Sequence, residues 1–422
     1  MHMYLCGSSP LMRALHTSCA GSEEQITNST AALESLIRVR SNEPATFIVG
    51  ALQPAPQPAP QPPPQPPPQP PPPAAVAFDE LVASTLAFAS TREIGRGGCA
   101  RVFIGQALPS LPNTPGPLAV KRLTPGGQQG ERELLREVKI LSRCSHPNLL
   151  PILGYCVDAR GLCLVYPIAS GGNLEDRLML TAEGCSRLQL LSCTPLPMPW
   201  QTRCRVLCET LRALTYLHNL STLHLDVKPS NILLDERCHA RLADAGLAKM
   251  VEGSSSSATH MTTNSVRGTP AFLCPIYLRT QEQSELTDGF AMGITILKAV
   301  TCLPDKNLVS ACRHMLRNPG QRDRWQAPGV PDTAAGEWPP HVVQTLLDLI
   351  NGLRDEFKED RMPLPTALRE LEAIVEAADE ARPSQQPTPG HKPEVHGPGA
   401  VYPKECMICL DQPRQVRFSC GQ

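Results

Sequence analysis

A run of prolines divides the chain and limits where a folded domain can form. Residues 53–73 read QPAPQPAPQPPPQPPPQPPPP, within a chain of 422 residues that contains 45 prolines. Proline fixes φ and has no amide hydrogen, so the run can continue neither a helix nor a central strand. We expect a polyproline II segment at about 3.1 Å per residue, which is a stiff spacer of roughly 60 Å.

Two interpretations of residues 53–77 remain open, a Pro-rich linker and a ligand for an SH3-like or WW-like groove. No Arg or Lys flanks the run to set the direction in which a peptide would lie in such a groove. We therefore favour the linker.

The sequence from Phe78 to about Ala377 has the composition of a globular domain. Short β-like runs come first and helical segments follow, an order that predicts a two-lobed α+β body. The expected strands are 101–104, 118–121 and 162–166, and the expected helices are 131–144, 201–218, 290–300, 341–353 and 364–377. Residues 1–52 receive no assignment, residues 378–404 read as a second Pro/Gly-rich linker, and residues 405–422 form a separate fragment.

Charge and hydropathy disfavour several classes of protein. Lys plus Arg total 39 and Asp plus Glu total 40, so the net charge of −1 provides no basic field for nucleic acid. No run of 18 apolar residues occurs, and Lys298 interrupts the best stretch, so no membrane span is expected. The 17 cysteines are scattered without a regular framework, which favours a reducing compartment such as the cytoplasm.

The segment Ile94–Val102 reads IGRGGCARV and is a candidate phosphate-binding turn. Glycines let the backbone approach phosphates and present its N–H groups, although Gly-rich turns are common and the pattern alone is weak. Nineteen residues after Val102 comes Lys121, at the end of an apolar run. Glu137 follows sixteen residues later on a predicted helix, where it could hold that lysine by an ion pair or simply face solvent.

The segment 224–235 reads HLDVKPSNILLD and offers three chemical tools in one loop. Asp226 can accept the proton of an attacking hydroxyl, Lys228 can neutralise a transferring phosphoryl group, and Asn231 can hold a divalent metal. Asp244, thirteen residues after Asn231, can be the second metal ligand. Phosphoryl transfer needs this combination of positioning, metal and charge neutralisation.

With these motifs in place, the sequence resembles the protein kinase family, and within it the branch of plant receptor-like and interleukin-1-receptor-associated kinases. The resemblance covers about 300 residues. It implies a bilobal fold with a small, mostly β N-lobe and a larger, mostly α C-lobe, and it implies ATP and Mg²⁺ as cofactors. The motif from Lys228 to Asn231 indicates a kinase of Ser/Thr hydroxyls on protein substrates. Further matching segments are 141–156, 171–178, 199–203 and 268–272.

The resemblance also implies roles for individual residues. Asp226, Lys228, Lys121 and Glu137 would be catalytic, and Asn231 and Asp244 would bind the metal. Tyr166 would be the gatekeeper before a hinge at 167–169, and Asp288 would anchor the catalytic loop. The expected nucleotide-binding residues are Ile94, Gly95, Arg96, Gly97, Gly98, Cys99, Ala100, Arg101, Val102, Ala119, Lys121 and Tyr166.

Four positions depart from the family's motifs: Ala100 for the third loop glycine, Leu225 for Arg of His-Arg-Asp, Ala245 for Phe of Asp-Phe-Gly, and Ile276 for Glu of Ala-Pro-Glu. None of these carries out phosphoryl transfer, so we expect catalysis to be retained. The alternative is a pseudokinase, a nucleotide-binding signalling scaffold. Ile276 argues most strongly for it, because the missing carboxylate would leave Arg361 without an ion pair.

The C-terminal fragment contains Cys406, Cys409 and Cys420, a spacing that resembles the opening of a RING zinc finger. A second alternative is therefore part of a RING-type ubiquitin ligase. A RING needs eight ligands around two zinc ions, and three thiolates do not close even one tetrahedral site. We expect an incomplete RING-like fragment that binds no zinc.

Overall fold

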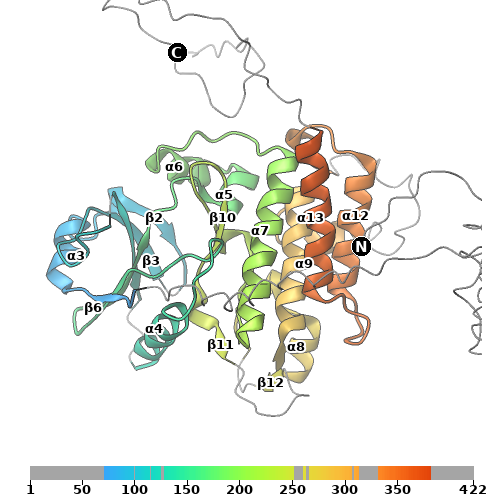
Figure 1. The fold of residues 1–422 in the computed structure, drawn as a ribbon. Helices are drawn as coiled ribbons and strands as arrows, with labels where there is room; N and C mark the ends of the chain where they lie inside the picture. The colour runs from blue at the N-terminus through green and yellow to red at the C-terminus, as the bar shows by residue number, and fades with distance from the viewer. Residues whose placement is uncertain are drawn as a thin grey trace, which may run out of the picture. The chain divides into compact units, whose positions relative to one another are not determined.

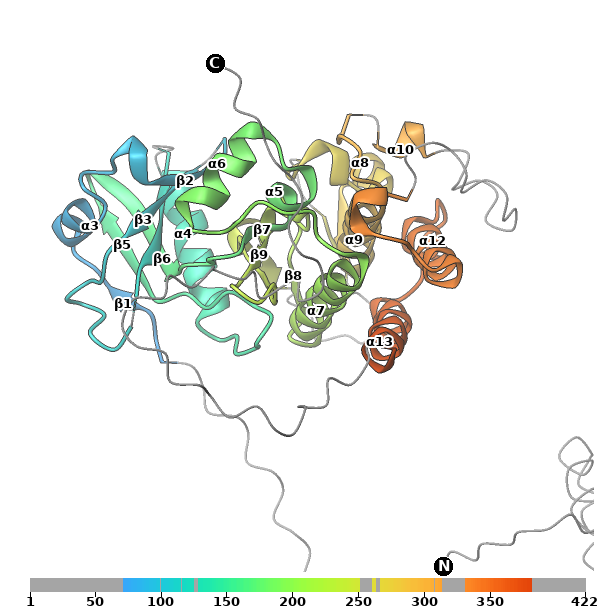
Figure 2. The ribbon, with the colours of Figure 1, turned by 90° about the horizontal axis from the view of Figure 1, so that it is seen from above.

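The structure is a computed structural model that describes residues 71–381, except 99, 115, 125–127, 251–259, 263–265, 307 and 313–330. All described residues belong to one compact unit (Figures 1 and 2). The proline run up to residue 70, the RING-like fragment and Cys99 lie outside the described residues, and so do the predictions made for them.

A mixed six-stranded sheet forms the first lobe (Figure 1). Its spatial order is β1-β5-β6-β4-β3-β2; β1 pairs with β5 in parallel, and the other neighbours pair antiparallel. The strands are β1 (Ala74–Ala75), β2 (Glu93–Arg96), β3 (Ala100–Gly105), β4 (Leu118–Leu123), β5 (Gly154–Asp158) and β6 (Gly161–Pro167).

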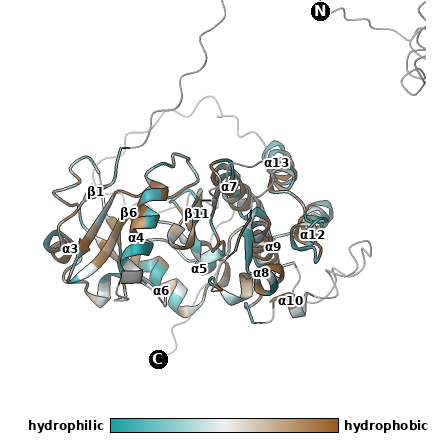
Figure 3. Cartoon of the chain, turned by 90° about the horizontal axis from the view of Figure 1, so that it is seen from below, coloured by the Kyte–Doolittle hydropathy of each residue, from teal (hydrophilic) through white to brown (hydrophobic). Residues whose placement is uncertain are grey.

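The two faces of this sheet are covered by different helices, because successive side chains of a strand point to opposite faces. Phe103, Val120 and Val165 pack in one apolar cluster with residues of α3 (Phe78–Ser84). Ala119 and Tyr166 belong to the other cluster, which includes α4 (Gln128–Leu141). Figure 3 shows hydrophobic residues along the strands and a mixed surface on α4.

Helices dominate the second lobe, where α7 packs against α13 and α9, and α9 packs against α12 (Figure 2). The helices are α5 (Leu174–Met179), α6 (Ala182–Leu190), α7 (Trp200–Asn219), α8 (Pro275–Thr280), α9 (Glu285–Thr301), α10 (Leu308–Ala311), α12 (Pro340–Arg354) and α13 (Leu364–Glu380). None of the helices in the described part of the chain is long and apolar enough to cross a membrane.

Short strands and single 3₁₀ turns complete the fold. The strands are β7 (Gly172–Asn173), β8 (Thr222–Leu223), β9 (Ile232–Leu234), β10 (Ala240–Leu242), β11 (Lys249–Met250), β12 (His260–Thr262) and β13 (Glu282–Ser284). They pair as β10-β9-β7, β11-β8 and β12-β13. The 3₁₀ turns are η1 (Ser90–Arg92), η2 (Pro229–Asn231), η3 (Ala245–Leu247), η4 (Pro270–Phe272) and η6 (Thr333–Ala335).

The predicted α+β fold with two lobes is confirmed, and each predicted strand and helix is present with small shifts of its ends. Two expected boundaries differ from the structure. The sheet begins at Ala74 rather than after residue 77, because the backbone of β1 pairs with β5. At the other end, α13 continues to Glu380, beyond the expected end at Ala377.

Candidate active site

Lys121 lies in the middle of β4 and makes two ion pairs, one with α4 and one with the residue that begins η3. Its Nζ atom is 3.3 Å from Oε2 of Glu137 on α4 and 2.6 Å from Oδ1 of Asp244. Burial would lower the pKa of Lys121, but the Asp244 and Glu137 carboxylates outweigh burial and raise it above its usual range. The predicted pairing of Lys121 with Glu137 is therefore present, and Glu137 does not face solvent.

Tyr166 on β6 holds the other oxygen of Glu137. The tyrosine hydroxyl donates a hydrogen bond of 2.6 Å to Oε1 of Glu137, which is only 2% exposed. Burial, and then the neighbouring carboxylate, raise the pKa of Tyr166 well above its usual value, so the hydroxyl remains a donor. The sequence placed Tyr166 among the nucleotide-binding residues and gave no sign that it would hold Glu137. This contact depends on how β6 and α4 lie against each other in the fold.

Asp244 begins the 3₁₀ turn η3 in a left-handed conformation, with φ of 66°. Burial would raise the pKa of Asp244, but the Lys121 ammonium outweighs burial and lowers it to about 2. Its side chain is still 41% exposed, so the carboxylate can reach a ligand. Ala245, in the position of the family's Phe, is 2% exposed and packs in the larger of the two apolar clusters.

The hairpin of β2 and β3 forms the candidate phosphate-binding turn. Gly97 N–H donates to the Ala100 carbonyl at 2.8 Å, and a Cβ at Gly98 would meet no atom within 4 Å. Arg96 and Arg101 both bind the Glu93 carboxylate, and hydrogen bonds from Arg96 and then Arg101 lower its pKa to about 2. The other expected nucleotide-binding residues lie on the same strands or on β4, namely Ile94, Gly95, Val102 and Ala119.

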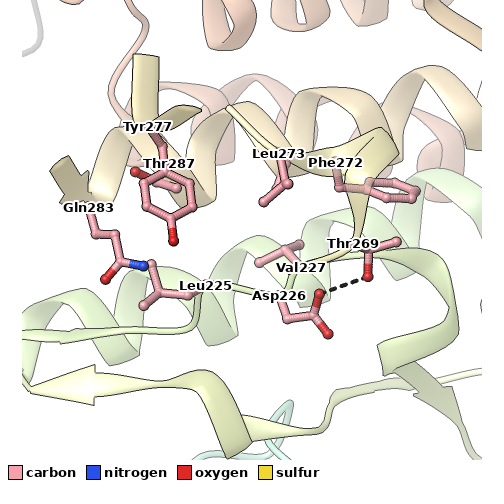
Figure 4. A pocket seen from close by; sticks show the side chains of 10 residues that line it. Leu225, Asp226, Val227, Thr269, Phe272, Leu273, Tyr277, Gln283 and Thr287 are labelled. Atoms are coloured by element: carbon pink, nitrogen blue, oxygen red, sulfur yellow. Dashed lines mark hydrogen bonds between the residues drawn. The ribbon is translucent and has the colours of Figure 1, made fainter. Parts of the chain in front are cut away.

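Asp226 is the centre of a second cluster, on the helical lobe. Its Oδ2 atom accepts hydrogen bonds from Lys228 Nζ at 2.6 Å and from Asn231 Nδ2 at 3.0 Å. The Thr269 hydroxyl donates to Oδ1 at 3.0 Å, as Figure 4 shows, and also accepts from Lys228 at 2.7 Å. Both carboxylate oxygens of Asp226 thus accept hydrogen bonds, and Thr269 links Asp226 to Lys228.

A buried carboxylate on α9 fixes the backbone of this loop. Asp288 is 0% exposed and accepts hydrogen bonds from the backbone N–H of His224 at 2.8 Å and of Leu225 at 2.7 Å. His218 Nε2 lies 2.8 Å from the same carboxylate, and its hydrogen bond overcomes the effect of burial, so the pKa of Asp288 is lowered. The predicted anchoring role of Asp288 is confirmed.

Leu225 occupies the place of an arginine and has no polar side-chain atom. Its backbone is left-handed, with φ of 68°, and its side chain is 9% exposed. It lines a narrow pocket together with Asp226, Phe272, Leu273 and Tyr277 (Figure 4). The loop at Asp226 is therefore ordered by Thr269 and Asp288 without a guanidinium at position 225.

Arg361 is buried although the family's carboxylate is replaced by Ile276. Its guanidinium donates to the carbonyls of Asp355 at 2.8 Å and Leu286 at 3.1 Å, and it lies 5.3 Å from the centre of the Phe290 ring. Ile276 packs against the apolar core. Carbonyl oxygens and an aromatic face thus contact the buried cation in the place of a carboxylate.

The two clusters face one another. The Lys228 ammonium and His224 both contribute to lowering the pKa of Asp244, after the larger effects of burial and Lys121. Nδ2 of Asn231 is bound to Asp226, and no hydrogen-bond donor reaches Oδ1 of Asn231 or Oδ2 of Asp244 among the described residues. Two free oxygens of this kind suit Mg²⁺, which takes one or two protein ligands and completes its shell with water and phosphate oxygens.

A sheet lobe, a helical lobe and a lysine–carboxylate cluster opposite an Asp-Lys-Asn loop define the class of enzymes that transfer phosphoryl groups from nucleotides. A family model described as "Protein kinase domain" matches residues 88–370, and the chain belongs to the protein kinase family. Its domain is of the serine/threonine type, like those of the relatives it matches.

Three plant proteins illustrate the similarity. Probable serine/threonine-protein kinase PBL18 of Arabidopsis thaliana is 34% identical over 276 residues, which cover 63% of this chain and 67% of that protein. Probable serine/threonine-protein kinase PBL23 of the same plant is 36% identical, covering 53% of this chain and 55% of that protein. The EPD1-interacting receptor-like cytoplasmic serine/threonine-protein kinase of Nicotiana benthamiana is 30% identical, covering 72% of this chain and 64% of that protein. The chain thus spans about half to two thirds of the length of these relatives, and the predicted branch of the family is confirmed.

Proposed function

We propose that this chain transfers the γ-phosphate of ATP to a Ser or Thr hydroxyl of a protein substrate. The observation that carries the proposal is the hydrogen-bonded Asp226–Lys228–Thr269 cluster facing the Lys121–Asp244 ion pair. ATP would supply the phosphoryl group, and Mg²⁺ would neutralise its charge. Positioning and electrostatics then provide nearly all of the catalysis in this reaction.

Asp226 acts as the base in this proposal. Three donors hold its carboxylate in place, so the group is oriented before a substrate hydroxyl arrives. The carboxylate accepts the hydroxyl proton while Lys228, bound to the same Oδ2, stabilises the negative charge on the transferring group. Thr269 fixes the distance between these two residues.

Lys121 and Glu137 position the nucleotide, and Asn231 and Asp244 hold the metal. Lys121 would exchange its contact with Asp244 for the phosphates, while Glu137 and Tyr166 keep its ammonium in place. Asn231 would present Oδ1 and Asp244 would present Oδ2. Gly97 and Gly98 leave the turn open, so backbone N–H groups can approach phosphate oxygens.

The test is transfer of labelled γ-phosphate to a generic basic protein with Mg²⁺. We expect transfer by the wild type, loss of transfer in Asp226→Asn and Lys121→Met, and normal transfer in Asp348→Asn. Asp348 is an exposed carboxylate on α12, so this variant controls for the substitution itself. Undiminished transfer by Asp226→Asn or Lys121→Met would refute the roles given to these residues.

The same experiment separates the enzyme from a pseudokinase. A scaffold of that kind would bind ATP, which would raise its Tm, but would transfer no phosphate. We favour the enzyme because Leu225, Ala245 and Ile276 are each accommodated by local packing, and the transfer residues form one connected site. The alternative of a RING-type ligase rests on residues 405–422, which lie outside the described residues.

A cytoplasmic location accompanies this proposal. A relative in Nicotiana benthamiana is named a cytoplasmic kinase. The eleven cysteines within the described residues are all unpaired, as in a reducing compartment. Fractionation of cells that express the full chain tests this, and recovery in a secreted fraction would contradict it.

A further inference from the structure

Arg177 on α5 is a buried cation whose partners are two sulfur atoms. The residue is 5% exposed, and one guanidinium nitrogen donates to Cys193 Sγ at 2.9 Å and to the Thr194 carbonyl at 3.4 Å. The other terminal nitrogen lies 3.8 Å from Cys238 Sγ. Nε is buried without a partner, and no carboxylate pairs with Arg177 in the described part of the chain. A buried guanidinium normally has an anionic partner.

The two thiols come from different parts of the helical lobe. Cys193 follows α6, and its N–H donates to the Leu188 carbonyl at 2.8 Å. Cys238 lies in the turn between β9 and β10, in a left-handed conformation with φ of 59°. The sequence gives no sign that Cys193 and Cys238 lie near the same side chain, because 45 positions separate them. One planar guanidinium brings them together.

The environments of the two thiols differ in a way that suits a two-step oxidation. Cys193 is half-buried, so a small oxidant can reach it, whereas Cys238 is 5% exposed. Burial raises the pKa of Cys238 in spite of the nearby Arg177 and Arg205, so its sulfur keeps its proton. A guanidinium that donates to sulfur stabilises the negative charge of an attacking thiolate.

We propose that Cys193 and Cys238 are a peroxide-sensitive thiol pair, in which Cys193 is oxidised first and Cys238 then closes a disulfide. In the first step Cys193 loses its proton and attacks hydrogen peroxide as the thiolate, the O–O bond breaks, and the released hydroxide takes up that proton, which gives a sulfenic acid and one water. In the second step Cys238 loses its proton and attacks the sulfenic sulfur as the thiolate, an S–S bond forms, the S–O bond breaks, and the released hydroxide takes up the proton as a second water. Two thiols and one peroxide thus give one disulfide and two waters.

Cys185 on α6 provides a matched comparison within the same chain. It is also half-buried, but among the described residues its sulfur has a hydrogen bond only to the Leu180 carbonyl, at 3.4 Å, and none with a cation. If the guanidinium determines reactivity, Cys193 reacts with peroxide about tenfold faster than Cys185.

The experiment treats the reduced full chain with hydrogen peroxide and maps its cysteines by peptide mass spectrometry, with and without dimedone to trap sulfenic acid. We expect a dimedone adduct on Cys193 about tenfold above that on Cys185, and a linked Cys193–Cys238 peptide when dimedone is absent. Cys238→Ser should abolish the linked peptide and increase the Cys193 adduct, while Cys185→Ser should change neither. Equal labelling of Cys193 and Cys185, or a Cys193 adduct without any linked peptide, would overturn the proposal.

Two variants of Arg177 test the role of its charge. Arg177→Met should reduce Cys193 labelling to the level of Cys185, and Arg177→Lys, which keeps a cation, should retain most of it. A thermal melt of each variant shows whether it is folded. If Arg177→Met is unfolded, the comparison of Cys193 with Cys185 and the Cys238→Ser result decide the question in the wild-type background. Full labelling of a folded Arg177→Met would refute the assignment.

Discussion

Removing one hydroxyl, in Tyr166→Phe, tests how Glu137 is held beside Lys121. The hydroxyl donates at 2.6 Å to a carboxylate that is 2% exposed, so water cannot readily replace it. A hydrogen bond to a charged group contributes about 1.5–3 kcal/mol, and an unsatisfied buried oxygen costs the same order. We expect the free energy of unfolding to fall by about 2 kcal/mol in Tyr166→Phe, and the KM for ATP to rise because Glu137 holds Lys121 less firmly.

The matched control is Tyr155→Phe on the neighbouring strand β5. The Tyr155 hydroxyl makes no hydrogen bond to any described residue, so its loss should change stability by less than about 0.5 kcal/mol. Thermal melts of the two variants and the wild type provide the measurement. At about 2 °C per kcal/mol for a body of this size, Tyr166→Phe should lower Tm by roughly 3–6 °C.

The reasoning would be refuted if the two tyrosine variants had the same Tm. It would also be refuted if Tyr166→Phe lowered Tm as expected but left the KM for ATP unchanged. In that second case the hydrogen bond would stabilise the fold without positioning Lys121.

Three further predictions follow from the geometry. Asp244→Asn should lose metal-dependent turnover, because a neutral amide is a poor ligand for Mg²⁺; an unchanged Mg²⁺ titration would count against its assigned role. Phosphoryl transfer should survive phosphatase treatment of the protein, because Leu225 offers no donor to a phosphate. It should also survive alanine replacement of the candidate phosphosites, and loss of most of the transfer rate after either treatment would contradict the prediction. Ala87→Gly should raise the free energy of unfolding by about 0.5–1 kcal/mol, because Ala87 has φ of 58°. Ala83→Gly, at an exposed helical position of α3, should lower it by a similar amount, and shifts of the same sign in denaturant melts would contradict the strain argument. The candidate phosphosites are Ser254–Ser257, Thr259, Thr262 and Thr263.

Much of the fold could be predicted because it rests on long periodic segments. The helix predicted at 201–218 is α7, and the helix at 364–377 is α13, since their apolar positions repeat at helical spacing. Strand β1 could not be predicted, because two alanines carry no strand pattern and gain their structure only from pairing with β5. Short elements of this kind depend on tertiary contacts.

The site was predictable where the chemistry depends on residue type and order. Lys121, Asp226 and Asp244 have charges that phosphoryl transfer needs, and the fold brings them together as expected. The compensation of Arg361 could not be predicted, because its partners are backbone carbonyls, which every residue carries. The sequence predicted correctly that Arg361 would lack an ion pair among the described residues, but not which neutral groups would contact its guanidinium instead.

The strand β1 has a mechanical consequence. Ala74 N–H donates to the Leu153 carbonyl at 2.9 Å, and Val76 N–H donates to the Tyr155 carbonyl at 2.8 Å. Since β1 runs parallel to β5, tension along the strand axis from the N-terminal side loads both hydrogen bonds together in shear, whereas peeling would break them one after the other. A force on the N-terminal side is therefore borne first by β5. Strand β5 lies next to β6, which carries Tyr166, and β6 lies next to β4, which carries Lys121. A force applied at the N-terminal side of β1 therefore acts two strands away from Lys121.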